Sequence, residues 1–176
     1  EGALLQVKGV SPNKTLQGNY NVIEKANEKL RDKLIKDLKD NDFIISKQEI
    51  KAKLLTAKER LSESPTIVGD AETTAQKLLN KAIMLIDENP GKGSGILKAR
   101  KQYDMWVKSQ KPKAFDANTE NAFSIANREI RNTMNDLLAK KAKDVEVKKS
   151  LSQQSSLFRA MDNIVPKAAK EADTAI

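Results

Sequence analysis

The stretch ILKARKQYDMWVKSQKPKAF, residues 96–115, holds the only tryptophan of the 176-residue chain, one of its two tyrosines, and six basic residues against one acidic residue. Apolar side chains recur in it at steps of three and four, the spacing that places side chains on one face of a helix. They are Ile96, Ala99, Tyr103, Trp106 and Val107. Large aromatic side chains bury on the order of 150–250 Å² each, and only 4% of the chain is aromatic. We therefore expect Tyr103 and Trp106 to lie in the core.

Further apolar stripes with helical spacing lie on both sides of this stretch. They run over residues 23–38, 50–61, 75–86, 122–138 and 151–165. Charged residues, 32% of the chain, fill the positions between the apolar ones, as in solvent-exposed amphipathic helices. Ser46 and Glu49 have the spacing of a capping box at the start of one helix. The sequence therefore predicts an all-α protein, a bundle of about six amphipathic helices.

Two tracts rich in glycine predict the division of the chain. Residues 1–18 contain three glycines and a proline, a composition typical of a flexible N-terminal arm. Residues 90–95, PGKGSG, separate two groups of three helical segments and predict a hinge. We therefore expect an arm at 1–18, a helical subdomain at 19–89, a hinge at 90–95 and a second helical subdomain at 96–176. Pro166 is expected to interrupt or kink the last helix.

The composition excludes several chemistries. The chain has no cysteine and no histidine, which rules out thiolate nucleophiles, Ser-His-Asp catalysis and metal centres built on Cys or His. The sequence therefore predicts a non-enzymatic protein without a cofactor. No apolar run approaches the roughly 18 residues that span a bilayer, so no membrane span is expected. The first residue is Glu1 rather than methionine, which is consistent with a processed product or a piece of a longer chain.

Two local motifs resemble ligand sites but lack their defining residues. The tract 91–95, GKGSG, lacks the Gly-Lys-Ser/Thr order of a phosphate-binding loop and follows a helical pattern rather than a strand. The run Asp40-Asn41-Asp42 begins like a calcium loop, but Ile45 stands at the sixth position and Lys51 at the twelfth. We interpret the first as a connection and the second as a helix terminus.

The strongest functional signal in the sequence is its excess of basic over acidic residues. The net charge is +8, which favours contact with a polyanion or an acidic partner. We expect the exposed face of the helix in 96–115, together with two arginines one turn apart, to make this contact. The candidate contact residues are Lys98, Arg100, Lys101, Arg128 and Arg131. Interspersed acidic residues dilute the patch, and no DNA-binding motif is recognisable, so DNA and an acidic protein both remain open as partners.

Residues 96–165 also resemble a known group of proteins. The runs KARKQYDMW, KAFD, NREIRNTMNDLLA and SLSQQSSLFRAMDNI are similar to helical segments of large virion-associated and polyprotein-like proteins of tailed bacteriophages and prophages. The resemblance does not extend to the N-terminal half. It implies a phage structural or internal-virion protein, located in the virion or in the cytoplasm of the bacterial host. It brings no family active site.

We therefore expect a non-enzymatic phage protein that acts through helix–helix assembly and a basic face. In this interpretation Ile130, Met134 and Leu137 form a structural stripe that packs against other virion proteins or a second copy, while the basic face contacts acidic protein or packaged DNA. Two alternatives remain open. One is a nucleic-acid-binding helical module, and the other is a phage-encoded binder or inhibitor of a host protein.

Overall fold

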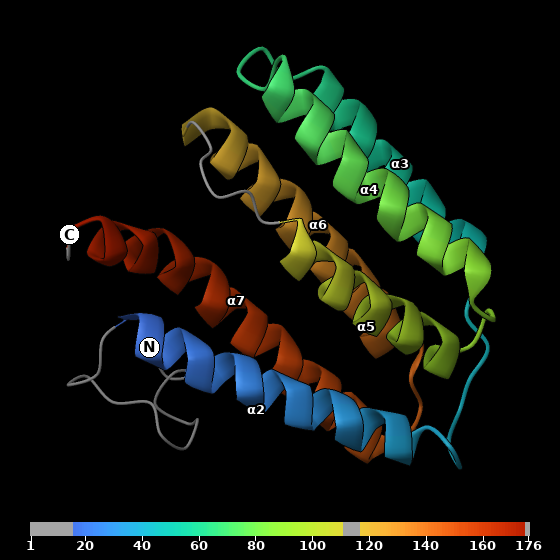
Figure 1. Ribbon diagram of the computed structural model, residues 1–176. Helices are drawn as coiled ribbons and strands as arrows, with labels where there is room; N and C mark the ends of the chain where they lie inside the picture. Colours follow the sequence, from blue (N-terminus) through green and yellow to red (C-terminus); the bar gives the residue numbers. More distant parts are fainter. Residues whose placement is uncertain (1–15, 111–116, 175–176) are drawn as a thin grey trace. The chain divides into compact units, whose positions relative to one another are not determined.

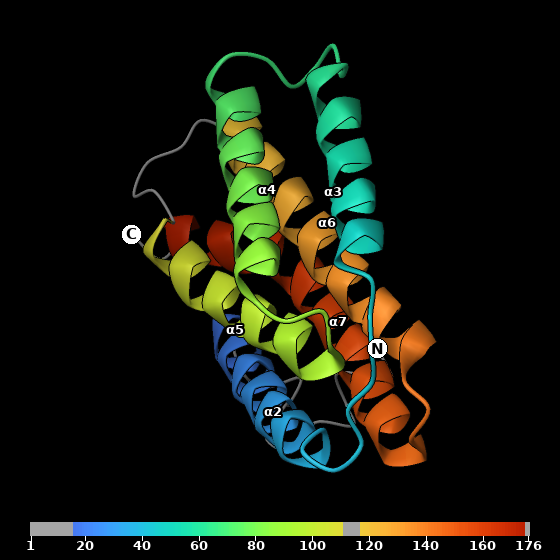
Figure 2. The same ribbon diagram turned by 90° about the vertical axis from the view of Figure 1, so that its right-hand side faces the viewer.

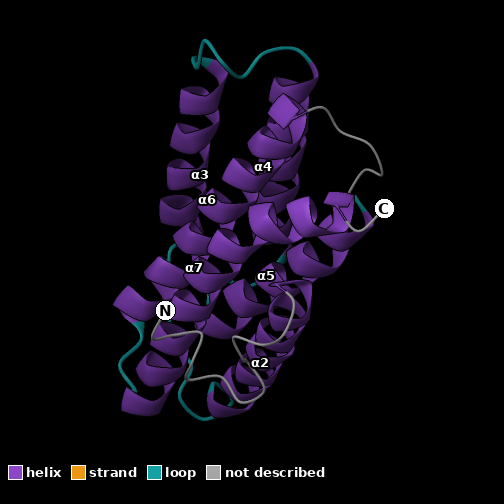
Figure 3. Cartoon of the chain, turned by 90° about the vertical axis from the view of Figure 1, so that its left-hand side faces the viewer, coloured by secondary structure: helices purple, strands orange, loops and turns teal. Residues whose placement is uncertain are grey.

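The computed structural model describes residues 16–110 and 117–174 (Figure 1). Six helices lie in these residues, which confirms the all-α prediction. They are α2 (Leu16–Asp37), α3 (Lys47–Ser62), α4 (Asp70–Glu88), α5 (Gly93–Ser109), α6 (Ala117–Lys141) and α7 (Val145–Thr174). Figure 3 shows helices joined by loops throughout this part of the chain. The predicted arm 1–18 lies outside the described residues, except that α2 begins within it at Leu16.

The chain divides into two compact units, and the boundaries differ from the predicted ones. Unit 1 combines the N-terminal helix α2 with the C-terminal helix α7, and unit 2, Leu38–Lys143, contains α3 to α6. The tract 90–95 lies inside unit 2 and does not separate two subdomains. Likewise α2 does not pair with α3 and α4, as a subdomain of 19–89 would require. Pairing between segments more than 100 residues apart is not visible in the local sequence pattern.

Unit 1 is an antiparallel pair of helices, drawn in blue and red in Figure 1. Ile23 of α2 is fully buried in a cluster with Leu157 and Phe158 of α7. The seam also holds polar side chains, since Asn27 and Gln154 are both buried and the Gln154 amide donates to the Asn27 carbonyl at 3.1 Å. A polar group buried in a helix pair costs stability unless it is hydrogen-bonded, so such a pair fixes the register of the two helices.

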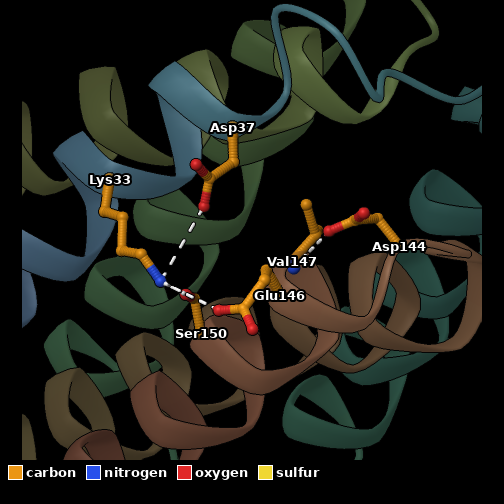
Figure 4. Close-up of polar contacts among 6 residues, drawn as sticks. All are labelled: Lys33, Asp37, Asp144, Glu146, Val147 and Ser150. Atoms are coloured by element: carbon orange, nitrogen blue, oxygen red, sulfur yellow. Dashed lines mark hydrogen bonds and ion pairs between the residues drawn. The ribbon is translucent and has the colours of Figure 1, made fainter.

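The far end of the pair is held by a small polar cluster (Figure 4). The Lys33 ammonium lies 3.5 Å from the Glu146 carboxylate and 3.9 Å from that of Asp37, and it donates to the Ser150 hydroxyl at 3.4 Å. Asp144 caps α7 by accepting a hydrogen bond from the Val147 amide at 3.0 Å. Side-chain caps of this kind stabilise a helix start by about 1 kcal/mol. The helix then continues past Pro166, so the proline does not interrupt it.

Unit 2 is a four-helix arrangement in which α4 packs against α3, α5 and α6 (Figure 2). The stripe Ile130, Met134 and Leu137 of α6 is 0–1% exposed and lies in the core of this chain. The expectation that these three residues pack against other proteins is therefore wrong, because the chain itself already buries them. They remain structural residues, as predicted, but only within the molecule.

The glycine-rich tract between α4 and α5 is tightly packed. Phe43 and Ile45, which precede α3, exchange backbone hydrogen bonds with Gly93 and Gly91 at 2.8 and 3.0 Å around an isolated antiparallel bridge. A side chain at Gly93 would meet the Phe43 ring at 2.6 Å. Glycine is needed here because the backbone at residue 93 lies close to the Phe43 ring. The prediction of a flexible hinge from composition is therefore wrong.

Two charged side chains complete this connection. The Asp42 carboxylate accepts hydrogen bonds from the backbone amide and hydroxyl of Ser94, in the first turn of α5. The Lys47 ammonium donates to the carbonyls of Asp87 and Asn89 at 3.1 Å each, at the end of α4. An anion at a helix start and a cation at a helix end both match the helix dipole. Ser46 caps α3 by accepting from the Glu49 amide, as the capping box predicts.

Candidate binding surface on helix α5

Helix α5 contacts both α4 and α6 in unit 2, and its side chains divide into four groups. One group points into the core, one contacts α6, one contacts α4, and one faces outward. Because the helix advances 100° per residue, residues three, four and seven apart share each face. The outward group holds the lysines of the predicted basic face, and the other three groups fix its position.

The contacts with α6 form a row of polar pairs. The buried Arg100 guanidinium donates to the Asn135 amide oxygen at 2.8 Å, and Arg131 lies 3.4 Å from the Asp104 carboxylate. On α6 the two partners are four residues apart, and so are the two on α5, so the pairs lie one turn apart along antiparallel helices. Buried polar pairs of this kind set which faces of two helices meet.

The Tyr103 hydroxyl makes the third polar contact of this row. It is buried and donates to the Asn127 amide oxygen at 3.0 Å. Burial raises the pKa of this hydroxyl well above its usual value; the nearby Arg131 guanidinium acts in the opposite direction and the Asp104 carboxylate adds to the increase. Tyr103 is therefore a neutral hydrogen-bond donor in the folded protein, and its predicted place in the core is correct.

The contacts with α4 involve Trp106. Its ring centroid lies 6.1 Å from that of Tyr103, and the Lys81 ammonium of α4 lies over the ring at 5.6 Å from the centroid. Lys77, one turn before Lys81, donates to Gln110 at 2.8 Å just beyond the end of α5. Trp106 is half-buried, so the expectation of a core tryptophan is only partly met. Tyr103, rather than Trp106, is the aromatic residue at the packing centre.

The outward face of α5 carries three lysines and one methionine at spacings of three, four and three. Lys98 and Lys108 are exposed, Lys101 is half-buried, and Met105 is 65% exposed. We call these four residues the α5 lysine face. Neither Lys98 nor Lys101 forms an ion pair with another described residue, whereas on α3 Lys51 pairs with a carboxylate at 2.6 Å. Lys98 and Lys101 are therefore cations available to a partner.

The predicted basic residues do not all reach this surface. Arg100 is 1% exposed, so the expectation that it lies on the basic face is wrong. It is held inside by Asn135, and its position one turn from the buried Tyr103 puts it on the inner side of α5. Arg131 is largely buried by its ion pair with Asp104. Arg128 is exposed on α6, as predicted, but its neighbour Arg131 turns towards α5 instead of lying beside it on the surface.

The charge of the chain is concentrated in the same unit. Unit 2 has 20 basic and 14 acidic residues, so it carries six of the eight net positive charges. Several of its cations are used internally, as in the pairs of Arg60 with Glu129 and of Lys141 with Glu49 at 3.1 and 3.9 Å. Lys98 and Lys101 of α5 differ from these cations, because neither forms an ion pair within the described residues.

Sequence reasoning missed two features of this surface. Met105 was not part of the apolar stripe, because it lies on the opposite side of α5 from Tyr103 and Val107. The contact of Lys81 with Trp106 depends on the packing of α4 against α5, which the local sequence pattern does not show. The exposed methionine could have been found from the helical spacing, since residue 105 shares a face with residues 98, 101 and 108.

The described residues lack the features of two other kinds of site. No cluster of three or more Asp, Glu, His or Cys side chains in them is arranged to hold a metal ion. None of the six helices there is both long and apolar enough to cross a bilayer. No protein-family model, curated protein or solved structure matches the chain. The fold and the surface define an all-α protein with an exposed basic helix face.

Proposed function

We propose that this chain is a non-enzymatic component of a bacteriophage particle, a helical protein that binds an acidic partner through the α5 lysine face. The observation that carries the proposal is the row of lysines on the outward side of α5, a helix whose other faces are fixed by α4, α6 and the core. The phage context rests on the resemblance of residues 96–165 to virion-associated proteins. It implies a place in the virion or in the host cytoplasm.

The physical basis of binding is electrostatic. Lysine ammonium groups are strongly hydrated point charges on flexible stems, so they attract an acidic surface without demanding one geometry. The interaction between exposed charges is screened over about 8 Å at physiological ionic strength. Binding through Lys98, Lys101 and Lys108 is therefore expected to weaken as salt is added, and to depend on these three positions together more than on any one of them.

The assembly that we propose differs from one built on buried stripes. Since Ile130, Met134 and Leu137 are enclosed within unit 2, contact with other virion proteins or with a second copy has to use residues that remain at the surface. The α5 lysine face is such a surface, and exposed Arg128 adds a cation on the adjacent helix α6. In this proposal the α5 lysine face makes the contacts with partner proteins that the sequence analysis assigned to the apolar stripe, as well as the contacts with acidic groups.

A second candidate is contact with packaged DNA through the same cations. Lysines on one helix face can neutralise backbone phosphates without reading the sequence, and such binding loses orders of magnitude in affinity between about 50 and 200 mM salt. Binding or inhibition of a host protein is a third candidate, which uses the same surface if that protein is acidic. The three candidates differ in the chemistry of the partner and share the α5 lysine face.

The test is fluorescence anisotropy with two labelled probes, a poly-glutamate peptide and a duplex DNA, from 50 to 200 mM salt. The variant Lys98→Glu/Lys101→Glu/Lys108→Glu reverses the charge of the face. We expect it to reduce affinity for the preferred probe by at least about tenfold at low salt, since removal of several phosphate or carboxylate contacts costs orders of magnitude.

The matched control is Lys39→Glu/Lys53→Glu/Lys143→Glu, which changes the net charge by the same amount at three exposed positions outside α5. Equal losses in the two triple variants would mean that only the total charge matters. Absence of binding to both probes at 50 mM salt would refute the proposed function.

A further inference from the structure

We infer that the outer face of α7, in unit 1, binds the phosphate backbone of duplex DNA. This surface is separate from the α5 lysine face, which belongs to unit 2. Residues 147–161 of the sequence include three basic residues, four serines and two glutamines, and they include no aspartate or glutamate. Polar side chains therefore occur all around this part of α7, and the structure divides them into an inner and an outer set.

The inner polar side chains hold α7 against α2. Ser150 and Gln154 are buried. Ser150 accepts a hydrogen bond from Lys33 of α2 at 3.4 Å, and the Gln154 amide donates to the Asn27 carbonyl of α2 at 3.1 Å. The apolar side chains of residues 147–160 are buried as well. The outer side of this part of α7 is therefore polar and takes no part in the seam of the helix pair.

The outer side chains offer cations and hydrogen-bond donors with no carboxylate among them. Five are exposed and form neither a hydrogen bond nor an ion pair with another described side chain: Lys148, Lys149, Ser152, Gln153 and Arg159. We call these five residues the α7 donor face. The carboxylate that directly precedes the face, that of Glu146, is paired with Lys33 at 3.5 Å (Figure 4). The cations of the face are therefore available to a partner.

This composition fits phosphate better than protein. Most contacts of proteins to the DNA backbone come from lysine, arginine, serine, glutamine and similar side chains, together with backbone amides. The centre of a protein interface is more apolar and poorer in charge. Among the side chains that the structure describes in α7, only Val145, in the first turn, is a large apolar one that is exposed. The α7 donor face itself has no apolar member.

The aromatic residues of unit 1 argue for a duplex over a single strand. Sequence-tolerant binding of single strands relies on bases stacked on exposed aromatic rings. The aromatic side chains described in unit 1 are those of Tyr20, which is half-buried, and Phe158, which is buried. The described part of unit 1 thus provides donors for phosphates and no exposed ring for a base.

The spacing of the face matches B-form DNA. Lys148, Ser152 and Arg159 follow one row of the helix, and Lys149 and Gln153 follow the next row about 100° away. Lys148 and Arg159 are eleven residues apart, about 16 Å along the helix axis, a length over which one DNA strand presents about five phosphates. A helix with its side chains is about as wide as the major groove. The two rows can therefore reach phosphates on both sides of that groove.

The experiment titrates the full chain against a labelled duplex of about 20 base pairs and mixed sequence, followed by fluorescence anisotropy from about 50 to 200 mM salt. The variant Lys148→Gln/Lys149→Gln/Arg159→Gln removes the three cations of the α7 donor face. We expect it to lower the affinity at least about tenfold at low salt. The slope of log K against log salt should decrease by about 2.7, because each phosphate contact contributes about 0.9.

The matched control is Lys25→Gln/Lys29→Gln/Lys36→Gln. It removes the same charge from three exposed positions of α2 in the same unit, on the side of α2 opposite its buried residue Ile23. We expect the affinity for the duplex to change by less than about threefold, and the salt slope by less than about 1. Equal losses in the two triple variants would mean that only the total charge of unit 1 matters, and would overturn the inference.

A second variant tests the position of the DNA without removing a cation. Ser152→Glu/Gln153→Glu places two carboxylates between the basic residues, at exposed positions where glutamate suits a helix. We expect a loss of duplex affinity of at least about tenfold at low salt, with an unchanged circular dichroism spectrum. Unchanged affinity would show that the duplex does not lie on this face.

Other anions and the α5 variant supply the remaining outcomes. Tighter binding of poly-glutamate, or of phosphatidylcholine vesicles containing phosphatidylserine, than of the duplex would assign the face to acidic protein or to a membrane surface and overturn the inference. The charge-reversal variant of α5 leaves the α7 donor face intact, so we expect it to keep its affinity for the duplex. Loss of duplex binding in that variant alone would support the proposed function and overturn the inference.

Discussion

Replacement of Gly95 by alanine tests the structure where it differs most from the expectation based on composition. Gly95 belongs to the glycine-rich tract that composition assigns to a flexible hinge, but in the structure it is buried in the first turn of α5. A Cβ atom built on it would lie 2.9 Å from the carbonyl carbon and 3.1 Å from the nitrogen of Pro90, and closer still to the carbonyl oxygen. The obstacle is backbone, which cannot rotate away as the end of a side chain could.

A flexible hinge and a packed turn predict opposite signs for the change in the free energy of unfolding. In a flexible hinge, Gly→Ala stabilises a protein by about 0.4–1 kcal/mol through the entropy of the unfolded chain. In the observed turn, alanine still gains about 1 kcal/mol of helix propensity, but overpacking against fixed neighbours costs about 1–3 kcal/mol. Because the clash is between two segments of backbone, we expect the overpacking cost to reach or exceed the upper end of this range. The free energy of unfolding should then fall by about 2 kcal/mol.

Thermal unfolding followed by circular dichroism at 222 nm measures this difference. A loss of about 2 kcal/mol should lower the Tm by at least about 4 °C in a chain of this size. Lys98→Ala is the control, since it places alanine on the exposed side of the same helix and should change stability by no more than about 0.5 kcal/mol. An unchanged or raised Tm for Gly95→Ala would refute the close packing of the turn against Pro90.

Three further predictions concern the capping residue of α3 and the polar row between α5 and α6. Ser46→Ala removes the side chain that caps α3 and should lower the free energy of unfolding by about 1 kcal/mol in urea titrations. Asn135→Ala removes an acceptor of the buried Arg100 guanidinium and should cost about 2–3 kcal/mol in the same assay, because a buried charged donor loses a partner. In a Tyr20→Phe variant, Tyr103 is the only tyrosine, and burial raises its pKa. The folded chain then keeps a proton that the unfolded chain releases near pH 10, so the free energy of unfolding should fall as the pH rises above about 10. Tyrosinate absorbance should appear only when the chain unfolds. A tyrosinate signal from the native protein near pH 10 would contradict the burial of this hydroxyl.

The candidate site was partly predictable. The helical spacing in residues 96–115 identified α5, the burial of Tyr103, and the lysines at 98 and 101 on the outer side. It failed for Arg100, because a periodic pattern assigns arginine to solvent and cannot foresee an amide such as Asn135 that accepts its hydrogen bond. It also failed for Arg131, which turns towards Asp104 on another helix. Pairing of polar groups between helices depends on tertiary packing.

The sequence by itself determined that the chain is helical, which apolar stripe belongs to each of the six described helices, and how one of them is capped by Ser46. These properties depend on local periodicity and on side chains that bond the backbone nearby, so they can be read from neighbouring residues. The partners of the helices were decided only in three dimensions. The pairing of α2 with α7, with buried Asn27 beside Gln154, and the rigid turn at Gly95 both arise from contacts between residues that composition treats as polar or flexible. Burial with a hydrogen-bonding partner, and the close approach of two backbones, are properties of the packed chain.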